Sequence, residues 1–387
     1  DVGQEGIELS FDDWLSGKPG KKKVLKNLYG EIVRDIMPVA EAIPGRNLRI
    51  SIDQRLQFLA YRELKSAISQ YKALSGSFVL LDVQTGEVLA MANQPSYNPN
   101  NRIQLDLSSV RNRAVTDVFE PGSTVKPFTV AVALESGLDA GYTIDTSPGF
   151  FKVDDAVVKD PRNRGVLDLG GILAYSSQVG ISRLALSLNE YDIWKQFQTL
   201  GFGEVTGVGF PGESSGFLPN RRRWKDIERV TFAYGYGLTV TPLQLASAYS
   251  TIASGGIKRE VTLIADQVSG GERVMNARIA LQLQSMLGRV ITEGTGQKAA
   301  IESYDVGGKT GTARKIGENG YDDTRHIAFF AGFAPQYSPR FVGVVLINEP
   351  KTEQVGGGSI AAPIFSRVMS NVLRLLSVPP TDTREAV

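Results

Sequence analysis

Cysteine is absent from the 387-residue sequence, and His326 is the one histidine. Without cysteine the chain can form neither disulfides nor thiolate metal sites, and one histidine excludes a His-rich metal site. His326 is also the only candidate for the base of a Ser-His-Asp triad. Because it precedes the apolar run 327–330, we expect it to be a structural or surface residue. We therefore predict no metal site.

The sequence also lacks an excess of positive or negative charge, and it lacks long apolar runs. The net charge of +1 argues against a dedicated nucleic-acid surface. No run of 18 apolar residues is present, so we expect no transmembrane helix in this sequence, and no signal peptide is visible. The chain starts abruptly at Asp1, which is compatible with the loss of an anchor that preceded it.

Apolar residues are plentiful enough for a sizeable core, at 42% of the chain. Apolar residues at helical spacing predict helices at 54–71, after the candidate N-cap Asp53, and at 30–42, 123–135, 173–188, 242–253, 277–290 and 362–376. Residues that favour strands, separated by turn signals, predict strands at 77–83, 87–92, 304–315, 327–333 and 340–348, with a turn at 317–320. Strands near both ends and a mostly helical middle predict an α+β fold: an antiparallel sheet built from the N- and C-terminal parts, with helices on both faces.

Loop signals divide the chain into parts of unequal size. Residues 1–48 contain turns at 17–20 and at Pro44-Gly45 and are too few to hold a core of their own. We interpret them as the remnant of a larger non-catalytic N-terminal region. Residues 49–378 would form the main domain, and 379–387 a C-terminal tail.

The sequence Glu120-Pro121-Gly122-Ser123-Thr124-Val125-Lys126 is the element around which the chain is organised. The Pro-Gly pair ends the preceding secondary-structure element, and a helix could begin at Ser123. Ser123 and Lys126 would share one face of a first turn, where an amine can take the proton of a hydroxyl nucleophile. The spacing alone is weak evidence, because Ser69 and Lys72 repeat it on an ordinary helix face.

Two further polar clusters supply what acyl transfer through a serine requires. The first is Ser176-Ser177-Gln178 at the head of a helical run, where a second serine could relay a proton. The second is Lys309-Thr310-Gly311-Thr312 at the start of the C-terminal strands, which offers a cation and hydroxyl donors for a carboxylate. Glycine there would allow a substrate backbone to lie close alongside the strand.

The order Ser-x-x-Lys, Ser-x-Asn, Lys-Thr-Gly is the signature of penicillin-binding proteins and serine β-lactamases. Together with residues 113–114, 119–126, 232–237, 241–246 and 309–313, it resembles class B penicillin-binding proteins, and most of all their division-specific FtsI type. The resemblance covers roughly residues 49–377, and 1–48 resemble the segment that precedes the transpeptidase domain in that family.

The resemblance implies the penicillin-binding transpeptidase fold and a peptidoglycan D,D-transpeptidase without metal or organic cofactor. Ser123 would attack the D-Ala-D-Ala bond of a stem peptide, Lys126 would act as general base and Ser176 would relay the proton. Lys309 would support the site electrostatically. The backbone N–H groups of Ser123 and Thr312 would form the oxyanion hole. The remaining residues implied to bind substrate or β-lactam are Gln178, Thr310, Gly311, Thr312 and Tyr236.

The resemblance also implies partners and a location. The partners would be stem peptides on lipid-linked or nascent strands, β-lactam antibiotics, and divisome membrane proteins including a glycosyltransferase, but no nucleic acid. The location would be the bacterial inner membrane, with a single-pass anchor outside this sequence and the catalytic domain in the periplasm.

The sequence departs from the family pattern at Gln178, where the second motif usually ends in Asn. Glutamine keeps the amide group but reaches one methylene further. This departure favours an alternative, a non-catalytic β-lactam sensor or scaffold, against which the intact Ser123, Lys126, Ser176 and Lys309 argue. A D,D-carboxypeptidase and a β-lactamase are further alternatives, although no matching Glu motif for deacylation is found.

Overall fold

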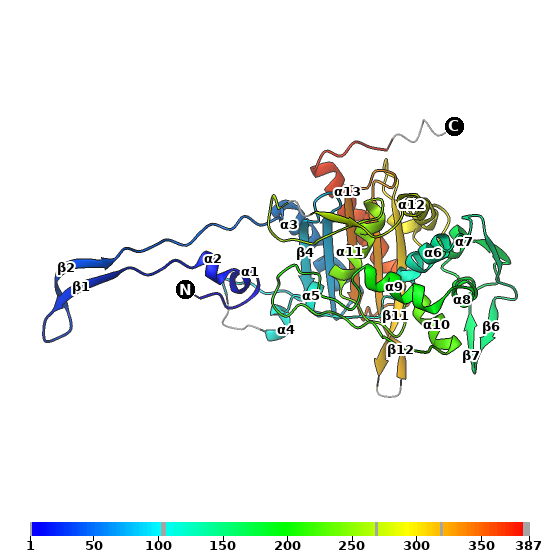
Figure 1. The fold of residues 1–387 in the computed structure, drawn as a ribbon, viewed down its shortest axis with the longest axis horizontal. Coiled ribbons are helices and arrows are strands. Elements are labelled where there is room, and N and C mark those ends of the chain that lie inside the picture. Colours follow the sequence, from blue (N-terminus) through cyan, green and yellow to red (C-terminus); the bar gives the residue numbers. More distant parts are fainter. Residues whose placement is uncertain (1, 102–105, 268–269, 318–319, 382–387) are drawn as a thin grey trace. The chain divides into compact units, whose positions relative to one another are not determined.

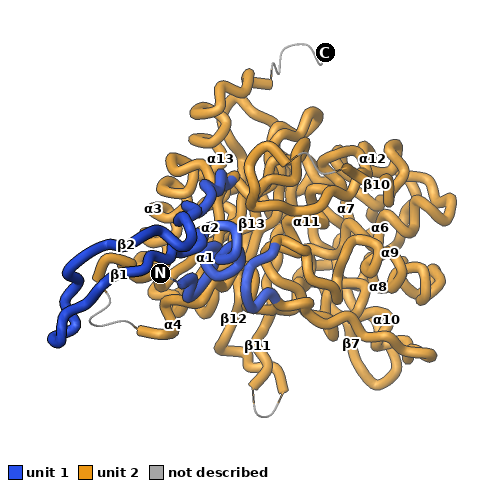
Figure 2. The backbone as a smooth tube through the Cα atoms, turned by 60° about the vertical axis from the view of Figure 1, so that its left-hand side comes forward, with its two compact units in different colours: residues 1–50, 209–213 blue, residues 51–208, 214–387 orange. Residues whose placement is uncertain are grey.

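The computed structural model describes residues 2–101, 106–267, 270–317 and 320–381. Its internal contacts divide the chain into two units, residues 1–50 with 209–213 and residues 51–208 with 214–387 (Figure 2). The elements of the smaller unit are α1 (Gly6–Ser10), α2 (Asp12–Leu15) and the antiparallel strands β1 (Lys21–Lys26) and β2 (Ile32–Ala40). The prediction of a helix at 30–42 is therefore wrong: most of this segment is strand β2. The β-branched residues Ile32, Val33, Ile36 and Val39 favour an extended chain, and Pro38 disfavours a helix interior.

A five-stranded antiparallel sheet forms the centre of the larger unit, in the order β11-β12-β13-β3-β4 (Figure 1). Its strands are β3 (Ser75–Asp82), β4 (Val88–Gln94), β11 (Gly307–Gly317), β12 (Gly320–Ala334) and β13 (Phe341–Asn348). Strands from the two ends of the domain pair directly, with Val345 opposite Phe78. This pairing confirms the predicted α+β fold. Residues 318–319 of the predicted turn lie outside the described residues.

Side chains of the central strands alternate between the two faces of the sheet. Phe78, Phe330 and Val345 belong to one core cluster, which α3 (Gln54–Tyr71) and α13 (Gly357–Leu375) cover. The other face packs against α11 (Pro242–Ala253). The sheet therefore has helices on both faces, as the sequence predicts.

The two edges of the sheet differ. At the β4 edge, the Gln57 side chain of α3 accepts a hydrogen bond from the Met91 N–H (2.7 Å) and donates one to the Met91 carbonyl (3.0 Å). A side chain thus occupies backbone groups that could otherwise pair with another strand. Strand β11 forms the opposite edge, and the candidate site residues Lys309, Thr310 and Thr312 lie on it.

The middle of the chain supplies the remaining elements. Its helices are α4 (Leu107–Val110), α5 (Arg113–Thr116), α6 (Lys126–Glu135), α7 (Leu169–Ala174), α8 (Gln178–Ser187), α9 (Glu190–Thr199), α10 (Asp226–Ala233) and α12 (Ala277–Thr292), with 3-10 turns at Gly122–Val125 and Gln297–Ala299. Its short strands are β5 (Thr143–Asp145), β6 (Phe150–Val153), β7 (Ala156–Lys159), β8 (Val166–Asp168), β9 (Ile257–Arg259) and β10 (Gly271–Arg273). The single helix predicted at 173–188 is two helices, because the chain turns at residues 175–177.

Within the described ranges, no helix combines the length and the apolar character that crossing a membrane requires.

Replacing Phe365 by alanine tests the core between the sheet and α13. Its side chain has no exposed surface, and its ring lies 4.8 Å from that of Phe330. We expect Phe365→Ala to lower the free energy of unfolding by about 3–5 kcal/mol, because the cavity cannot close fully. Phe58→Ala is the control: Phe58 is 62% exposed, and its loss should change stability by less than about 0.5 kcal/mol. Equal shifts of the two variants in urea unfolding would contradict this account of the core.

Candidate active site

Ser123 lies in a 3-10 turn, Gly122–Val125, that leads directly into α6. The helix begins at Lys126, three residues later than the sequence suggests. Gly122 takes a left-handed φ of 48°, which glycine adopts without strain and which turns the chain sharply before the serine. Ser123 is half-buried, and its hydroxyl makes no hydrogen bond with any residue that the structure describes. The hydroxyl therefore has no competing partner.

Lys126 is the buried amine of this site. Its side chain has no exposed surface, and Nζ lies 2.6 Å from the Ser176 carbonyl oxygen, 3.3 Å from that of Ser177 and 3.2 Å from Ser176 Oγ. Burial lowers the pKa of Lys126 to about 7, and the charge of Asp160 opposes that shift. Near neutral pH a substantial fraction of this amine is unprotonated and can accept a proton.

Lys309 of strand β11 is the second fully buried lysine. Its Nζ donates a hydrogen bond to the Thr310 carbonyl (3.3 Å). Burial holds the pKa of Lys309 well below its usual range, and the positive charge of Lys126 lowers it further. The two amines thus disfavour each other's protonation, so the site resists carrying two positive charges at once.

Strand alternation separates the residues of the third motif. A Cβ built on Gly311 would lie 1.9 Å from the Phe329 ring, so only glycine fits there. Lys309 is two residues before Gly311 and therefore lies on the same face of β11. Thr310 and Thr312 point to the other face. Thr310 Oγ1 lies 2.7 Å from the hydroxyl of Thr295, and Thr312 Oγ1 accepts a hydrogen bond from the N–H of Gly357 (3.1 Å). The Lys309 side chain and the two threonine hydroxyls therefore lie on opposite faces of β11.

Ser176 ends helix α7 in an unusual backbone conformation. The N–H of Ser177 donates to the Ile172 carbonyl (3.0 Å) and that of Ser176 to the Leu173 carbonyl (3.2 Å), which is the Schellman pattern of helix termination. Glycine is preferred at the position that Ser176 occupies, yet Ser176 holds a φ of 56°. Strain of this kind persists where the surrounding contacts enforce it, and it is enriched at functional sites.

Ser177 and Gln178 start helix α8. The Ser177 hydroxyl accepts a hydrogen bond from the Gly180 N–H (2.8 Å), which makes Ser177 the N-cap. Asp160, which directly follows the β6–β7 hairpin, accepts hydrogen bonds from the Ser177 hydroxyl and the Gln178 N–H, both at 2.5 Å. No local pattern in the sequence marks Asp160, because it lies 17 positions before Ser177. The Gln178 side chain is half-buried.

Tyr236 lies in an aromatic group beside the turn Gly122–Val125, the nucleophile turn, which contains Ser123. Its ring is 5.7 Å from that of Tyr234 and 5.4 Å from that of Tyr321, and burial raises the pKa of Tyr236. Glu120 accepts hydrogen bonds from the Gly237 N–H (2.8 Å) and the Tyr321 hydroxyl (3.0 Å). The residues that flank Ser123 are thus tied to the segment that contains Tyr236 and to β12.

The nucleophile turn packs against Gly235 too closely for a side chain at that position. A Cβ on Gly235, which has a φ of 94°, would lie 2.2 Å from the Gly122 carbonyl oxygen. A Cβ on Gly122 would lie 3.5 Å from the carbonyl oxygen of Thr312. The backbone around Ser123 therefore lies directly against β11, and Lys126, next to the same turn, contacts Ser176. Three segments far apart in the sequence meet here, as the motif order predicts.

Comparisons with known proteins show the family to which this chain belongs. Residues 76–370 match the penicillin binding protein transpeptidase domain, and residues 1–50 match the penicillin-binding protein dimerisation domain. The chain belongs to the penicillin-binding protein transpeptidase family. The resemblance to its class B, FtsI-type members is confirmed by the curated relatives.

Two curated relatives and one solved structure show how far the similarity extends. Peptidoglycan D,D-transpeptidase FtsI of Escherichia coli is 46% identical over 381 residues, which cover 98% of this chain and 64% of that protein. Probable peptidoglycan D,D-transpeptidase PenA of Neisseria flavescens is 42% identical over 384 residues, or 98% of this chain and 96% of that one. The apo transpeptidase domain of penicillin-binding protein 3 from Burkholderia pseudomallei has a TM-score of 0.79 at 38% identity, covering 87% of this chain and 99% of that one. The chain thus spans less than two thirds of the E. coli relative.

Exchanging single glycines tests the close packing of the nucleophile turn in this family member. Gly235→Ala combines an unfavourable φ with a clash against Gly122, so we expect it to lower the free energy of unfolding by more than about 2 kcal/mol. Gly237→Ala is the matched control, because its φ of 76° is also unfavourable but no atom lies within 4 Å of the added Cβ. It should cost about 1 kcal/mol. If urea unfolding showed the same loss for both, the contact between Gly235 and Gly122 would not constrain the turn.

Proposed function

We propose that this chain contains the catalytic domain of a peptidoglycan D,D-transpeptidase that acts in septal cell-wall synthesis. The observation that carries the proposal is a fully buried Lys126 with a pKa of about 7, placed three residues after an accessible Ser123 and in contact with Ser176. A serine acylation reaction needs such a base. The names of the E. coli and N. flavescens relatives carry the same activity.

The residues of this site account for each bond and proton transfer of acylation and of crosslinking. Ser123 Oγ attacks the carbonyl carbon of the penultimate D-Ala, and its proton passes to neutral Lys126. The C–N bond then breaks, and the amine of the terminal D-Ala takes up a proton and leaves, which forms an ester on Ser123. The amine of a second stem peptide attacks that ester, forms the crosslink and returns the hydroxyl to Ser123.

The contacts of Lys126 support a proton relay through Ser176. A neutral amine has two hydrogens and one lone pair. The carbonyls of Ser176 and Ser177 lie at 2.6 and 3.3 Å and can accept the two hydrogens. The lone pair is then available to a hydroxyl proton, and Ser176 Oγ lies 3.2 Å away. We infer that Ser176 passes a proton between Lys126 and the leaving amine.

The remaining site residues would hold the substrate. Lys309 lies buried beside Lys126 and would stabilise negative charge on the substrate when it is protonated. Thr310 and Thr312 would bind the terminal carboxylate, and the substrate backbone would lie along the edge of β11 beside Gly311. The N–H groups of Ser123 and Thr312 would bind the oxyanion. Gln178 and Tyr236 would line the site.

Domain roles, partners and location complete the proposal. Residues 49–378 would form the transpeptidase domain, 1–48 the end of a dimerisation region and 379–387 a tail. Stem peptides and β-lactams would bind at Ser123, and divisome membrane proteins, including a glycosyltransferase, would be partners. The catalytic domain would lie in the periplasm of a protein anchored in the inner membrane.

Replacing Ser123 by alanine tests the nucleophile. We expect intact-mass spectrometry to show one added benzylpenicillin on the wild-type chain and none on Ser123→Ala, with an unchanged melting temperature. Acylation of the mutant at the wild-type rate would refute the assignment. A wild-type adduct that is hydrolysed within seconds would indicate a β-lactamase, and a stable adduct without turnover of a thioester substrate would indicate a sensor or scaffold.

The pH dependence of acylation tests the base. Because burial lowers the pKa of Lys126 to about 7, the neutral form increases as pH rises through 7. We expect the acylation rate by benzylpenicillin to increase about tenfold from pH 6 to pH 8. The charged neighbour that acts on Lys126 is Asp160, whose carboxylate opposes the effect of burial. A flat profile over this range, measured by stopped-flow fluorescence, would exclude Lys126 as the titrating base.

A further inference from the structure

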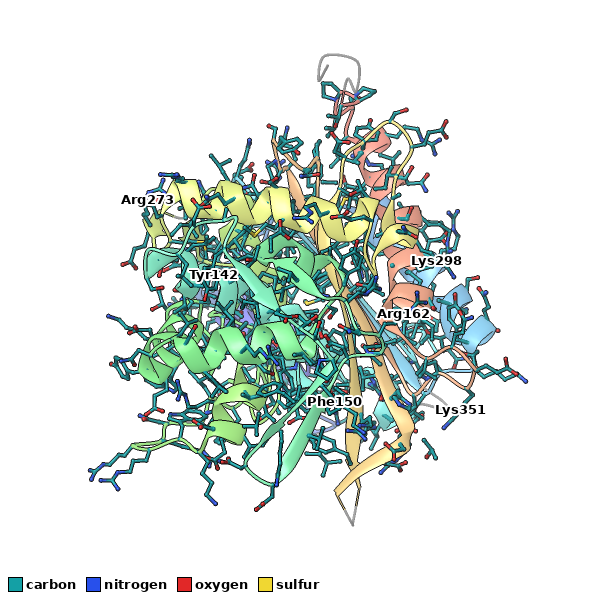
Figure 3. All side chains as sticks on the ribbon, turned by 90° about the vertical axis from the view of Figure 1, so that its right-hand side faces the viewer. Tyr142, Phe150, Arg162, Arg273, Lys298 and Lys351 are labelled. Carbon is teal, nitrogen blue, oxygen red and sulfur yellow. The ribbon has the colours of Figure 1, made fainter. Side chains whose placement is uncertain are left out.

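Two arginine side chains in the loop between β7 and β8 have no hydrogen-bond or ion-pair partner among the residues that the structure describes. They are Arg162 and Arg164, and both are exposed. The guanidinium of Arg164 instead lies over an aromatic ring, 4.1 Å from the centroid of Tyr175. Figure 3 shows Arg162 on the same face of the larger unit as Lys298, which is also exposed. The loop therefore presents positive charge on this face.

The acidic residues that flank this loop are bound elsewhere. Asp160, at its start, accepts hydrogen bonds from the Ser177 hydroxyl and from two backbone N–H groups of α8. Asp168, at the end of β8, forms an ion pair with Arg289 of α12 (2.7 Å). Neither carboxylate pairs with Arg164, so its guanidinium keeps its N–H donors for a ligand.

Hydrogen bonds fix the backbone on the far side of Arg164. The Gly165 carbonyl accepts from both the N–H (2.7 Å) and the hydroxyl (2.8 Å) of the buried Thr146. The Gly165 N–H donates to Asn163 Oδ1 (3.0 Å), and its φ of 64° is one that glycine adopts without strain. Arg164 is thus held by a fixed backbone and by the Tyr175 ring. Such fixing lowers the entropy that a binding side chain loses.

Tyr175 places this arginine beside the proton relay. It follows α7 directly and precedes Ser176, whose hydroxyl lies 3.2 Å from Lys126 Nζ. Under the proposed function, Ser176 passes a proton to the leaving amine. The acceptor amine must lose its proton at the same place, because it attacks the ester carbonyl along the path by which the first amine left. An acceptor stem whose amine reaches Ser176 therefore lies next to Tyr175 and Arg164.

We propose that Arg164 binds a carboxylate of the acceptor stem peptide and so favours crosslinking over hydrolysis of the acyl-enzyme. This inference rests on the proposed function. The terminal carboxylate of the donor leaves with D-Ala, whereas the acceptor stem brings a carboxylate of its own. A guanidinium binds a carboxylate through two parallel charge-assisted hydrogen bonds. Water, the competing acceptor, has no such group and gains nothing from Arg164.

The ratio of crosslinked to hydrolysed product from one acyl-enzyme tests this role. A D-alanyl thioester acylates the chain. The acceptor is a stem peptide without its two D-Ala residues, which keeps the acceptor amine and cannot act as a donor. It is supplied either with a free C-terminal carboxylate or as the C-terminal amide. We expect mass spectrometry to show a ratio about tenfold higher with the carboxylate on the wild-type chain, because the amide loses the charge-assisted pair.

Two substitutions of Arg164 separate its charge from its shape. Arg164→Gln should lower the ratio for the carboxylate acceptor about tenfold and leave the ratio for the amide unchanged, so that the preference disappears. Arg164→Lys keeps the charge but not the planar fork, and it should retain part of the preference. The rate of acylation by benzylpenicillin should be unchanged in both variants, since acylation precedes the arrival of the acceptor.

Arg46→Gln is the matched control. In the smaller unit, the guanidinium of Arg46 also lies over an aromatic ring, 4.7 Å from the centroid of Trp14. The substitution removes the same charge and the same kind of contact from a segment that does not adjoin Ser176 in the chain. It should keep the wild-type preference for the carboxylate acceptor.

The outcomes distinguish the two levels of the proposal. A wild-type chain that is not acylated, or whose acyl-enzyme transfers to neither acceptor, overturns the proposed function. A wild-type chain that crosslinks without preferring the carboxylate, or an Arg164→Gln variant that keeps the preference, overturns the role of Arg164 alone, even when the melting temperature falls. An equal loss of preference in Arg46→Gln would contradict a local contact. Slower acylation of Arg164→Gln with an unchanged ratio would assign Arg164 to the donor and overturn the proposal.

Discussion

The burial of Lys126 beside Lys309 is the constraint on which the rest of this site depends. Both side chains have no exposed surface, and each lies close enough for its charge to act on the other. An ammonium group removed from water loses several kcal/mol of solvation free energy unless it is compensated. The protein supplies Lys126 with two backbone carbonyls and a nearby carboxylate, which is enough to hold the amine in place but leaves its pKa near 7.

The fold accounts for how such a site can be built. The sheet pairs strands from both ends of the larger unit, so the helical middle of the chain is placed against one sheet face and next to the β11 edge. The nucleophile turn lies against β11 at Gly122, near the Thr312 carbonyl, and against Gly235, where only glycine leaves room for the backbone of Gly122. At the other edge, Gln57 occupies β4. The two edges of the sheet therefore differ: β11 contains the Lys-Thr-Gly motif, whereas the Gln57 side chain occupies backbone groups of β4.

Periodicity in the sequence is sufficient to predict the sheet, α3, α11, α12 and α13, because long amphipathic or apolar segments are dominated by burial. It fails at residues 30–42, where a helical spacing coincides with β-branched residues. It also fails at Ser176, where two helices meet in a turn that uses a serine in the place of glycine. The three motifs identify the segments that meet in the site. Asp160 could not be found this way, since its contacts with Ser177 and Gln178 arise only when a distant hairpin folds onto α8.

The most direct test of the central claim is a pH titration of the lysine side chains by NMR, with 13C-labelled lysine in the folded chain. The account predicts a Cε resonance that titrates near pH 7 and disappears in Lys126→Met. A Lys126 resonance that titrates only near pH 10, as exposed lysines do, would show that the amine is protonated at neutral pH. That result would contradict its assignment as the base.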